Sequence, residues 1–411
     1  MPIMILIEKM MIWLLPIYHF LKIKSLKFKK RIKVVFIATN LSMWRYQNLY
    51  QTLRKNPKFD VYILITPFIE FDSQQQINDY NTLTNYFEEN KIPFLSAINK
   101  DNTPFNLRKE INPDILFYPQ PYRRIVSPSL QYTHFLDKLL CYYPYAFWTS
   151  KGEWSYNQGF HNMAWKLFYS TELHRKDAIL YSMNKGKNVE IVGYPNADNF
   201  LSGTYRNVWK KQDTPKKRII WAPHYTIFSG GYLCQSNFLS IAENMIDLAK
   251  NYTDKIQFAF KPHPKLYTEL CNHKDWGKQK TEAYYQQWKT MENSQLESGE
   301  YIDLFMTSDA MIHDSSSFTV EYHYSQKPVM FITNNYNKHL EGKSDFGKLA
   351  MEQHYIGKNK EDIIQFIENV VLKGNDPMKA GREDFFKRYL LPPNGKTVAQ
   401  NTMDVFIKAF C

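Results

Sequence analysis

The chain has 411 residues, of which 44% are hydrophobic and 22% charged, so it can bury a large core divided between two domains of ordinary size. Its cysteines lie far apart, which excludes a disulfide framework and a zinc-ligand motif and is typical of the reducing cytosol. They are Cys141, Cys234, Cys271 and Cys411. The formal net charge is +12, and its interpretation depends on where the basic residues lie.

Most of the positive charge lies near the N-terminus. Residues 1–35 contain eight Lys or Arg and one acid, and so carry seven of the twelve net charges. A nucleic-acid-binding protein would spread its basic residues over the folded surface, so nucleic acid is not an expected partner. The apolar stretch 1–21 is interrupted by Glu8 and Lys9, which disfavours a spanning helix and a secretory signal. We expect residues 1–30 to associate peripherally with the cytoplasmic face of the cell membrane, with a true span and a plain surface or core helix as alternatives.

The first half of the chain alternates between predicted strands and helices. Residues 31–40 form a basic lead into a continuous apolar run, which is typical of a buried parallel strand. Further strands are predicted at residues 60–68, 114–122, 139–147 and 189–192. This alternation predicts a Rossmann-like N-terminal domain over residues 31–206.

A charged run at residues 207–218, "NVWKKQDTPKKR", is interpreted as the linker to a second domain. After it, the alternation returns, with strands predicted at 218–224, 256–264, 310–314 and 327–333 and helices at 237–252, 360–374 and from the serines near 315 onward. The second domain is therefore predicted to span residues 207–411, with a terminal helix. The predicted fold class is α/β, with two Rossmann-like domains facing each other across a cleft.

Three polar turns each follow a predicted strand of the second domain. They read "WAPHYT" at 221–226, "KPHP" at 261–264 and "HDSSSF" at 313–318. Ligands of open α/β sheets bind at the carboxyl ends of the strands, so these turns are predicted to converge. Imidazoles and hydroxyls can hold a diphosphate without a metal ion, so we expect no metal and no other cofactor. The sequence contains neither a glycine-rich phosphate loop nor an H-E-x-x-H motif.

Each turn also has a simpler interpretation. His224 alone is consistent with a core or helix-entry histidine, whereas His263, between two prolines, favours a positioned side chain. Asp314 and the serines that follow it are consistent with a helix N-cap. The acid pair Glu70 and Asp72 lies in a polar loop, which is more typical of a surface than of a metal site. The joint position of the three turns favours a phosphate site.

Four segments together resemble the CDP-glycerol glycerophosphotransferase family, the teichoic-acid primases and polymerases. They read "GYPNAD" at 193–198, "WAPHYT", "FKPHP" at 260–264 and "MIHDSSSFTVEYHYSQKPVMF" at 311–331. The resemblance covers roughly residues 180–405. The positions that match the family's last motif are Asp314, Ser316, Ser317, Tyr322, Lys327 and Pro328, with Ser315 in place of a tyrosine and Glu321 in place of a second acid.

The resemblance implies a GT-B-type transferase, with an acceptor domain at residues 31–206 and a nucleotide-donor domain at 207–411. It implies catalytic roles for His263 and His224 at the donor diphosphate. The donor-binding residues that it implies are Gly193, Pro223, Asp314, Ser315, Ser316, Ser317 and Glu321.

Two departures from the family pattern bear on the mechanism. Where the family has Pro-Thr-Trp-Arg, this chain has residues 223–226, so His224 is the candidate to replace a phosphate-binding arginine. The family's His-Gly motif, whose histidine is the proposed base, matches "CYYPYAF" at 141–147, which has no histidine. Tyr143 and Tyr145 are candidates to line the acceptor site, but neither is an obvious base near neutral pH.

The resemblance implies transfer of a glycerol phosphate, or a related polyol phosphate, from a CDP-activated donor. The predicted partners are this nucleotide-activated donor, a lipid-linked or cell-surface glycan or polymer acceptor, and the cytoplasmic face of the membrane. One alternative is a glycosyltransferase that uses a nucleotide sugar in surface-polysaccharide synthesis. The other is a noncatalytic nucleotide-binding homologue, which the missing His-Gly motif would explain.

Overall fold

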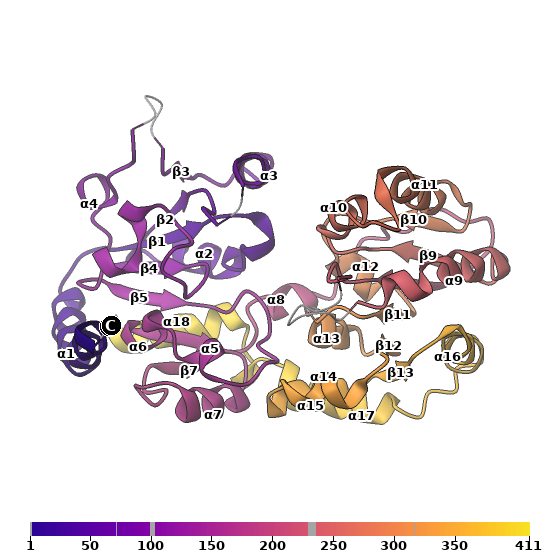
Figure 1. The fold of residues 1–411 in the computed structure, drawn as a ribbon. Helices are drawn as coiled ribbons and strands as arrows, with labels where there is room; N and C mark the ends of the chain where they lie inside the picture. The colour runs from indigo at the N-terminus through magenta and orange to yellow at the C-terminus, as the bar shows by residue number, and fades with distance from the viewer. Residues whose placement is uncertain (1, 71, 99–102, 229–235, 317) are drawn as a thin grey trace. The chain divides into compact units, whose positions relative to one another are not determined.

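Two parallel β-sheets organise the chain (Figure 1). The computed structural model describes residues 2–70, 72–98, 103–228, 236–316 and 318–411. The chain divides into a first unit, Met1–Asp198 with Tyr389–Cys411, and a second unit, Asn199–Arg388. Each unit is a Rossmann-like α/β structure with helices packed on its sheet, which confirms the predicted α/β class with two Rossmann-like parts.

The first unit contains a seven-stranded parallel sheet with the order β3-β2-β1-β4-β5-β6-β7. Its inner strand β1 (Ile32–Ala38) is buried almost throughout and pairs with β2 on one edge and with β4 on the other. The strand order reverses between β1 and β4, which is the topological switch point of this sheet. The other strands are β2 (Phe59–Ile65), β3 (Leu95–Ser96), β4 (Ile115–Tyr118), β5 (Leu139–Tyr142), β6 (Lys166–Tyr169) and β7 (Val189–Ile191).

The helices of the first unit pack their apolar residues against this sheet. Helix α2, for example, buries Leu49, Tyr50 and Leu53, which lie on one face at helical spacing. The helices are α1 (Pro2–Lys27), α2 (Gln47–Arg54), α3 (Ser73–Glu89), α4 (Leu107–Glu110), α5 (Glu153–Tyr156), α6 (Gly159–Met163), α7 (Glu172–Tyr181) and α18 (Val398–Phe410), while α8 (Ala197–Phe200) contains the boundary between the units.

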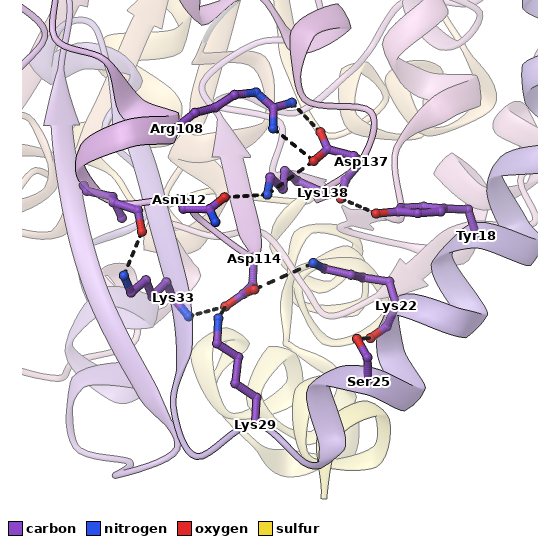
Figure 2. A network of polar contacts seen from close by, with 11 residues as sticks. Tyr18, Lys22, Ser25, Lys29, Lys33, Arg108, Asn112, Asp114, Asp137 and Lys138 are labelled. Atoms are coloured by element: carbon purple, nitrogen blue, oxygen red, sulfur yellow. Dashed lines mark hydrogen bonds and ion pairs between the residues drawn. The ribbon is translucent and has the colours of Figure 1, made fainter.

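Helix α1 is an integral part of the first unit and not a separate segment as predicted. Leu15 and Leu26 are buried, and the helix contacts α6 and α18. Figure 2 shows how polar side chains attach α1 and the residues just after it to the sheet: Lys22 of α1 and Lys29, two residues beyond its end, form ion pairs of 3.8 and 2.5 Å with Asp114. Because Asp114 is buried, these cations compensate the cost of removing its charge from water. Among the described helices, α1 included, none has the length and hydropathy needed to cross a bilayer.

The terminal helix α18 also belongs to the first unit, whereas the sequence assigned it to the second domain. In Figure 1 its yellow ribbon lies among the magenta elements of the first unit. Phe406 is fully buried and packs against Phe59 and Trp165 at ring-centroid distances of 5.8 and 5.7 Å. The apolar side of this helix is therefore covered by the first sheet, which its sequence periodicity alone does not reveal.

The second unit contains a six-stranded parallel sheet with the order β10-β9-β8-β11-β12-β13. This is the Rossmann order, with the switch point between β8 and β11. The strands are β8 (Lys217–Ala222), β9 (Ile256–Phe260), β10 (Ser294–Leu296), β11 (Ala310–His313), β12 (Val329–Ile332) and β13 (Tyr355–Gly357). Strands β3, β6, β10 and β13 were not predicted.

The helices of the second unit are α9 (Phe238–Asn251), α10 (Leu266–Cys271), α11 (Gly277–Thr290), α12 (Ile302–Met306), α13 (Phe318–Glu321), α14 (Tyr336–Glu341), α15 (Asp345–Met351), α16 (Lys360–Gln365) and α17 (Lys379–Phe385). A helix starting near the serines was predicted, and α13 is a single turn there. It continues as a 3₁₀ turn that ends at Gln326, whose φ of 57° is incompatible with a continuing helix.

The charged run at 207–218 is not the linker between the units. The chain passes from one unit to the other at residues 198–199, and the run lies against the second unit. Trp209 is 5% exposed, its Nε1 donates to Oγ1 of Thr307 at 3.0 Å, and the Arg218 guanidinium lies 5.5 Å from its ring centroid. One buried tryptophan thus fixes a segment whose charge suggested a solvated loop.

Candidate nucleotide-donor site

The site is built at the switch point of the second sheet, where His224 follows β8 and Asp314 follows β11. The Asp314 carboxylate accepts hydrogen bonds from the backbone N–H of His224 at 2.6 Å and of Asn237 at 2.6 Å. The hydroxyl of Ser236 donates to the same carboxylate at 3.0 Å. Asp314 is buried, and burial raises the pKa of its carboxyl to about 6, although these hydrogen bonds act in the opposite direction. Asp314 thus joins the turn after β8 to the start of α9.

The turn after β9 is joined to the turn after β8. The backbone N–H of His263 donates to the carbonyl oxygen of Pro223 at 3.0 Å. The rings of His224 and His263 lie 5.0 Å apart, and Tyr225 lies 4.4 Å from His263. The three turns therefore converge, as predicted from their positions at strand ends.

Both imidazoles have a defined hydrogen-bonding arrangement. The backbone N–H of Lys265 donates to Nδ1 of His263 at 3.2 Å, so the neutral ring carries its hydrogen on Nε2. Nδ1 of His224 lies 2.9 Å from Oγ1 of Thr226. Burial lowers the pKa of His224 to about 4, and burial together with the nearby His224 and Lys265 lowers that of His263 to about 3. Both rings are therefore neutral near pH 7 in the ligand-free protein, and each has one N–H that can serve as a hydrogen-bond donor.

The serines after β11 lie in different environments. Ser315 is buried, and its carbonyl oxygen lies 3.0 Å from Nδ1 of His313. Ser316 is partly exposed, while Ser317 lies outside the described residues. We call residues 314–316 the serine turn. Further along, Glu321 is buried and accepts hydrogen bonds of 2.9 Å from the hydroxyl of Tyr301 on both of its oxygens.

One neighbouring residue, Lys261, was missed as a site residue by the sequence analysis. Lys261 directly follows β9, is 6% exposed, and donates from Nζ to the carbonyl oxygen of Gly299 at 2.7 Å. Burial lowers the pKa of its ammonium to about 8, against the opposing effect of Glu297 and Glu300. Its Nζ lies 5.9 Å from the Tyr301 ring centroid. The sequence signal that could have identified Lys261 is a lysine placed between an apolar strand and Pro-His-Pro.

Three predicted site residues, Gly193, Tyr143 and Tyr145, belong to the first unit. Gly193 has a φ of 100°, and a Cβ at this position would lie 3.0 Å from atoms of Pro392 and Val398, so the position requires glycine for close packing. Tyr143 is 2% exposed, and its hydroxyl forms a hydrogen bond with Thr402. Its prediction as an acceptor-lining residue is wrong, because it lies in the core among aromatic side chains.

Tyr145 is half-buried, and its carbonyl oxygen accepts a hydrogen bond from Nε of Arg45 at 3.1 Å, so its predicted place at the acceptor site stays a prediction. Two histidines whose rings lie beside residues 141–147, His161 and His174, are both buried. His174 uses Nδ1 toward Thr171 and Nε2 toward the carbonyl of Trp148, and burial lowers its pKa to about 4. His161 is fully buried, and its pKa falls to about 3. Neither ring is presented to solvent as a base.

Among the described residues, no group of three or more His, Cys, Asp or Glu side chains is arranged to hold a metal ion. Metal-independent donor binding stays a prediction.

Comparison with known structures first defines the class: the two parallel α/β units have the fold of GT-B-type enzymes. The wall teichoic acid polymerase TagF matches with a TM-score of 0.60 at 14% identity, over 93% of this chain and 90% of that chain. MnaA of S. aureus, solved with UDP, matches with a TM-score of 0.57 at 12% identity, over 92% and 96%. UDP-GlcNAc 2-epimerase from Neisseria meningitidis, bound to UDP-GlcNAc, matches with a TM-score of 0.53 at 10% identity, over 92% and 99%.

The family itself follows from the sequence. The family model for CDP-Glycerol:Poly(glycerophosphate) glycerophosphotransferase matches residues 156–400, more than half of the chain. The chain belongs to this family and is an enzyme of the glycerophosphotransferase type. A comparison with curated proteins gives no significant match.

Proposed function

We propose that this enzyme transfers glycerol phosphate, or a closely related polyol phosphate, from a CDP-activated donor to a glycan or polymer acceptor of the teichoic-acid type. The observation that supports this most strongly is the hydrogen-bonded convergence of His224, His263 and Asp314 at the switch point of the second sheet. These residues lie within the segment that matches the family, and switch points are where α/β sheets bind nucleotides.

In the proposed reaction, an acceptor hydroxyl oxygen attacks the phosphorus that carries the glycerol. A new P–O bond forms while the bond from this phosphorus to the bridging oxygen breaks, CMP leaves with the electron pair, and the proton of the acceptor hydroxyl passes to solvent or to the leaving phosphate. Negative charge therefore grows on the leaving phosphate. The Nε2–H of His263 and the hydroxyl of Ser316 are the proposed donors to its oxygens, because fixed donors stabilise charge that develops in the transition state. Asp314 holds the turns that position these donors.

We further propose that α1 lies on the surface of the membrane that carries the acceptor. Six of its apolar side chains recur at helical spacing and are each more than half exposed: Met10, Trp13, Leu14, Ile17, Phe20 and Leu21. The exposed Lys24, Lys27 and Lys30 follow them and complement anionic headgroups. Because an ion pair joins α1 to the sheet of the first unit, membrane contact by α1 would orient that unit as well.

A vesicle co-sedimentation assay tests this proposal. Binding to phosphatidylglycerol vesicles but not to phosphatidylcholine vesicles, and loss of that binding in Trp13→Glu/Ile17→Glu, would support it. Equal binding of the variant contradicts it.

A donor screen tests the proposed reaction. Purified enzyme is incubated with CDP-glycerol, CDP-ribitol and UDP-sugars in the presence of a teichoic-acid-type acceptor, and the released nucleotide is identified. Release of CMP together with growth of the acceptor is the expected result. Release of a nucleoside diphosphate from a sugar donor would instead identify a glycosyltransferase, and binding of nucleotide without turnover would identify a noncatalytic homologue.

A further inference from the structure

Two buried histidines lie directly behind the serine turn. His313 is the last residue of β11, and His354 lies between α15 and β13. Their Nε2 atoms are 3.1 Å apart. Nδ1 of His313 lies 3.0 Å from the carbonyl oxygen of Ser315, and Nδ1 of His354 lies 2.9 Å from the carbonyl oxygen of Ala350. The pair thus connects the serine turn to the end of α15.

The number of N–H hydrogens on the two rings decides how many of these three hydrogen bonds can form. A carbonyl oxygen only accepts, so each Nδ1 must carry a hydrogen to form its bond. A neutral imidazole carries one hydrogen, and with both on Nδ1 the two Nε2 atoms face each other with lone pairs. All three hydrogen bonds form only when the pair holds three hydrogens and therefore one net positive charge. The neutral pair leaves one of the three contacts without its hydrogen.

The surroundings oppose this extra proton in the ligand-free protein. His313 is fully buried and His354 is 3% exposed, and burial lowers the pKa of both rings, that of His354 to about 3. The charged and titratable groups around the pair are mainly basic: His323, His339, Lys343 and Arg382, the last ion-paired with Asp376. An anion placed at the serine turn would offset this positive field.

We propose that His313 and His354 are positioning residues that take up one proton when the donor diphosphate binds at the serine turn. This inference rests on the proposed function, because it requires a phosphate at residues 314–316. The proton completes the three hydrogen bonds, fixes the carbonyl of Ser315, and adds a positive charge behind the bound anion. Donor affinity then increases as the pH falls, by no more than tenfold per pH unit for one linked proton.

Titration calorimetry of the full chain with CDP-glycerol at pH 6, in buffers of different ionisation enthalpy, measures the proton uptake. His354→Asn keeps a donor toward Ala350 and removes the atom that faces His313. His323→Gln is the matched control, because Nε2 of His323 also donates to the Ala350 carbonyl, at 3.2 Å, but lies outside the pair. We expect His354→Asn to take up at least about half a proton less per CDP-glycerol bound than wild type does. His323→Gln should take up the same number of protons as wild type. His224, His263 and Asp314 are present in all three proteins, so their own proton uptake cancels in this comparison.

Equal proton uptake in all three proteins would overturn the inference while leaving the proposed function intact. Absence of binding by both CDP-glycerol and inorganic pyrophosphate would refute a phosphate site at the turn and the inference with it. If His354→Asn does not fold, ¹⁵N NMR of the imidazoles decides: an imidazolium signal that appears on saturation with CDP-glycerol in wild type, and is retained in His224→Ala and His263→Ala saturated with the same ligand, supports the proposal. Unchanged neutral signals in the bound wild type contradict it.

Discussion

The backbone N–H of His224 donates to Oδ1 of Asp314 over 2.6 Å, and this bond ties the ends of β8 and β11 together across the switch point. Asp314 also accepts from the backbone N–H of Asn237, so one carboxylate organises two loops. Asp314, the acid of the family motif, therefore holds the backbone of these two loops in place. Its carboxylate is largely occupied by internal hydrogen bonds.

Asp314→Asn is expected to destabilise the second unit by about 1–3 kcal/mol near pH 7, because an amide N–H₂ would face donors that now meet a carboxylate oxygen. The difference should depend on pH. The folded pKa is raised from 3.8 to about 6, so the carboxyl's stabilising contribution is fully present below about pH 4 and is lost as the pH rises through 6. Urea unfolding of both proteins between pH 5 and 7.5 should show wild type gaining stability over the variant as the pH falls. A difference in the free energy of unfolding that stays constant over this pH range would refute the raised pKa of the buried carboxyl.

His263→Ala should lower turnover by about 10²–10³-fold with little change in melting temperature, since its Nε2–H is the proposed donor to the leaving phosphate. His273 provides a matched control in the same unit. Its Nδ1 accepts from the backbone N–H of Asp275 at 3.2 Å, in the same local arrangement as His263 with Lys265. His273→Ala should keep wild-type turnover. Similar losses in both variants would mean that the imidazole supports the local turn only.

Ser316→Ala and Ser344→Ala separate a phosphate-binding serine from a capping serine. Ser344 caps α15, and its side chain accepts from the backbone N–H of Gly347 at 3.2 Å. Its replacement should cost about 1 kcal/mol of stability and leave donor affinity unchanged. Ser316→Ala should give the opposite pattern, with weaker donor binding and an unchanged melting temperature. If Ser316→Ala loses stability and binds CDP-glycerol normally, the serine turn is structural.

The elements that could be predicted from the sequence are those whose structure depends on residues close together in the chain. Continuous apolar runs identified β1, β2, β8, β9 and β11, and polar residues directly after the last three identified the turns that converge. The short strands β10 and β13 were missed because their sequences, Ser-Gln-Leu and Tyr-Ile-Gly, contain no continuous apolar run. Trp209 and Phe406 show the other kind of failure, because the burial of each depends on segments far away in the chain. Likewise, nothing local indicates that Asp114 pairs with Lys22 and Lys29 or that His313 meets His354.

Deletion of residues 1–30 should destabilise the first unit, because it uncovers the site of Leu15 and removes both lysines that pair with the buried Asp114. Thermal unfolding should show a lower melting temperature for the truncated protein. Trp13→Ser is the control, since this side chain is 77% exposed and its replacement should leave the melting temperature unchanged. A truncated protein as stable as the full chain would show that α1 is a detachable tether after all.

The most direct test of the account is a crystal structure of the full chain with CDP-glycerol. We predict that the diphosphate lies at the switch point between β8 and β11, with phosphate oxygens within hydrogen-bond distance of Nε2 of His263 and the hydroxyl of Ser316. A diphosphate bound elsewhere, out of reach of both side chains, would contradict the account.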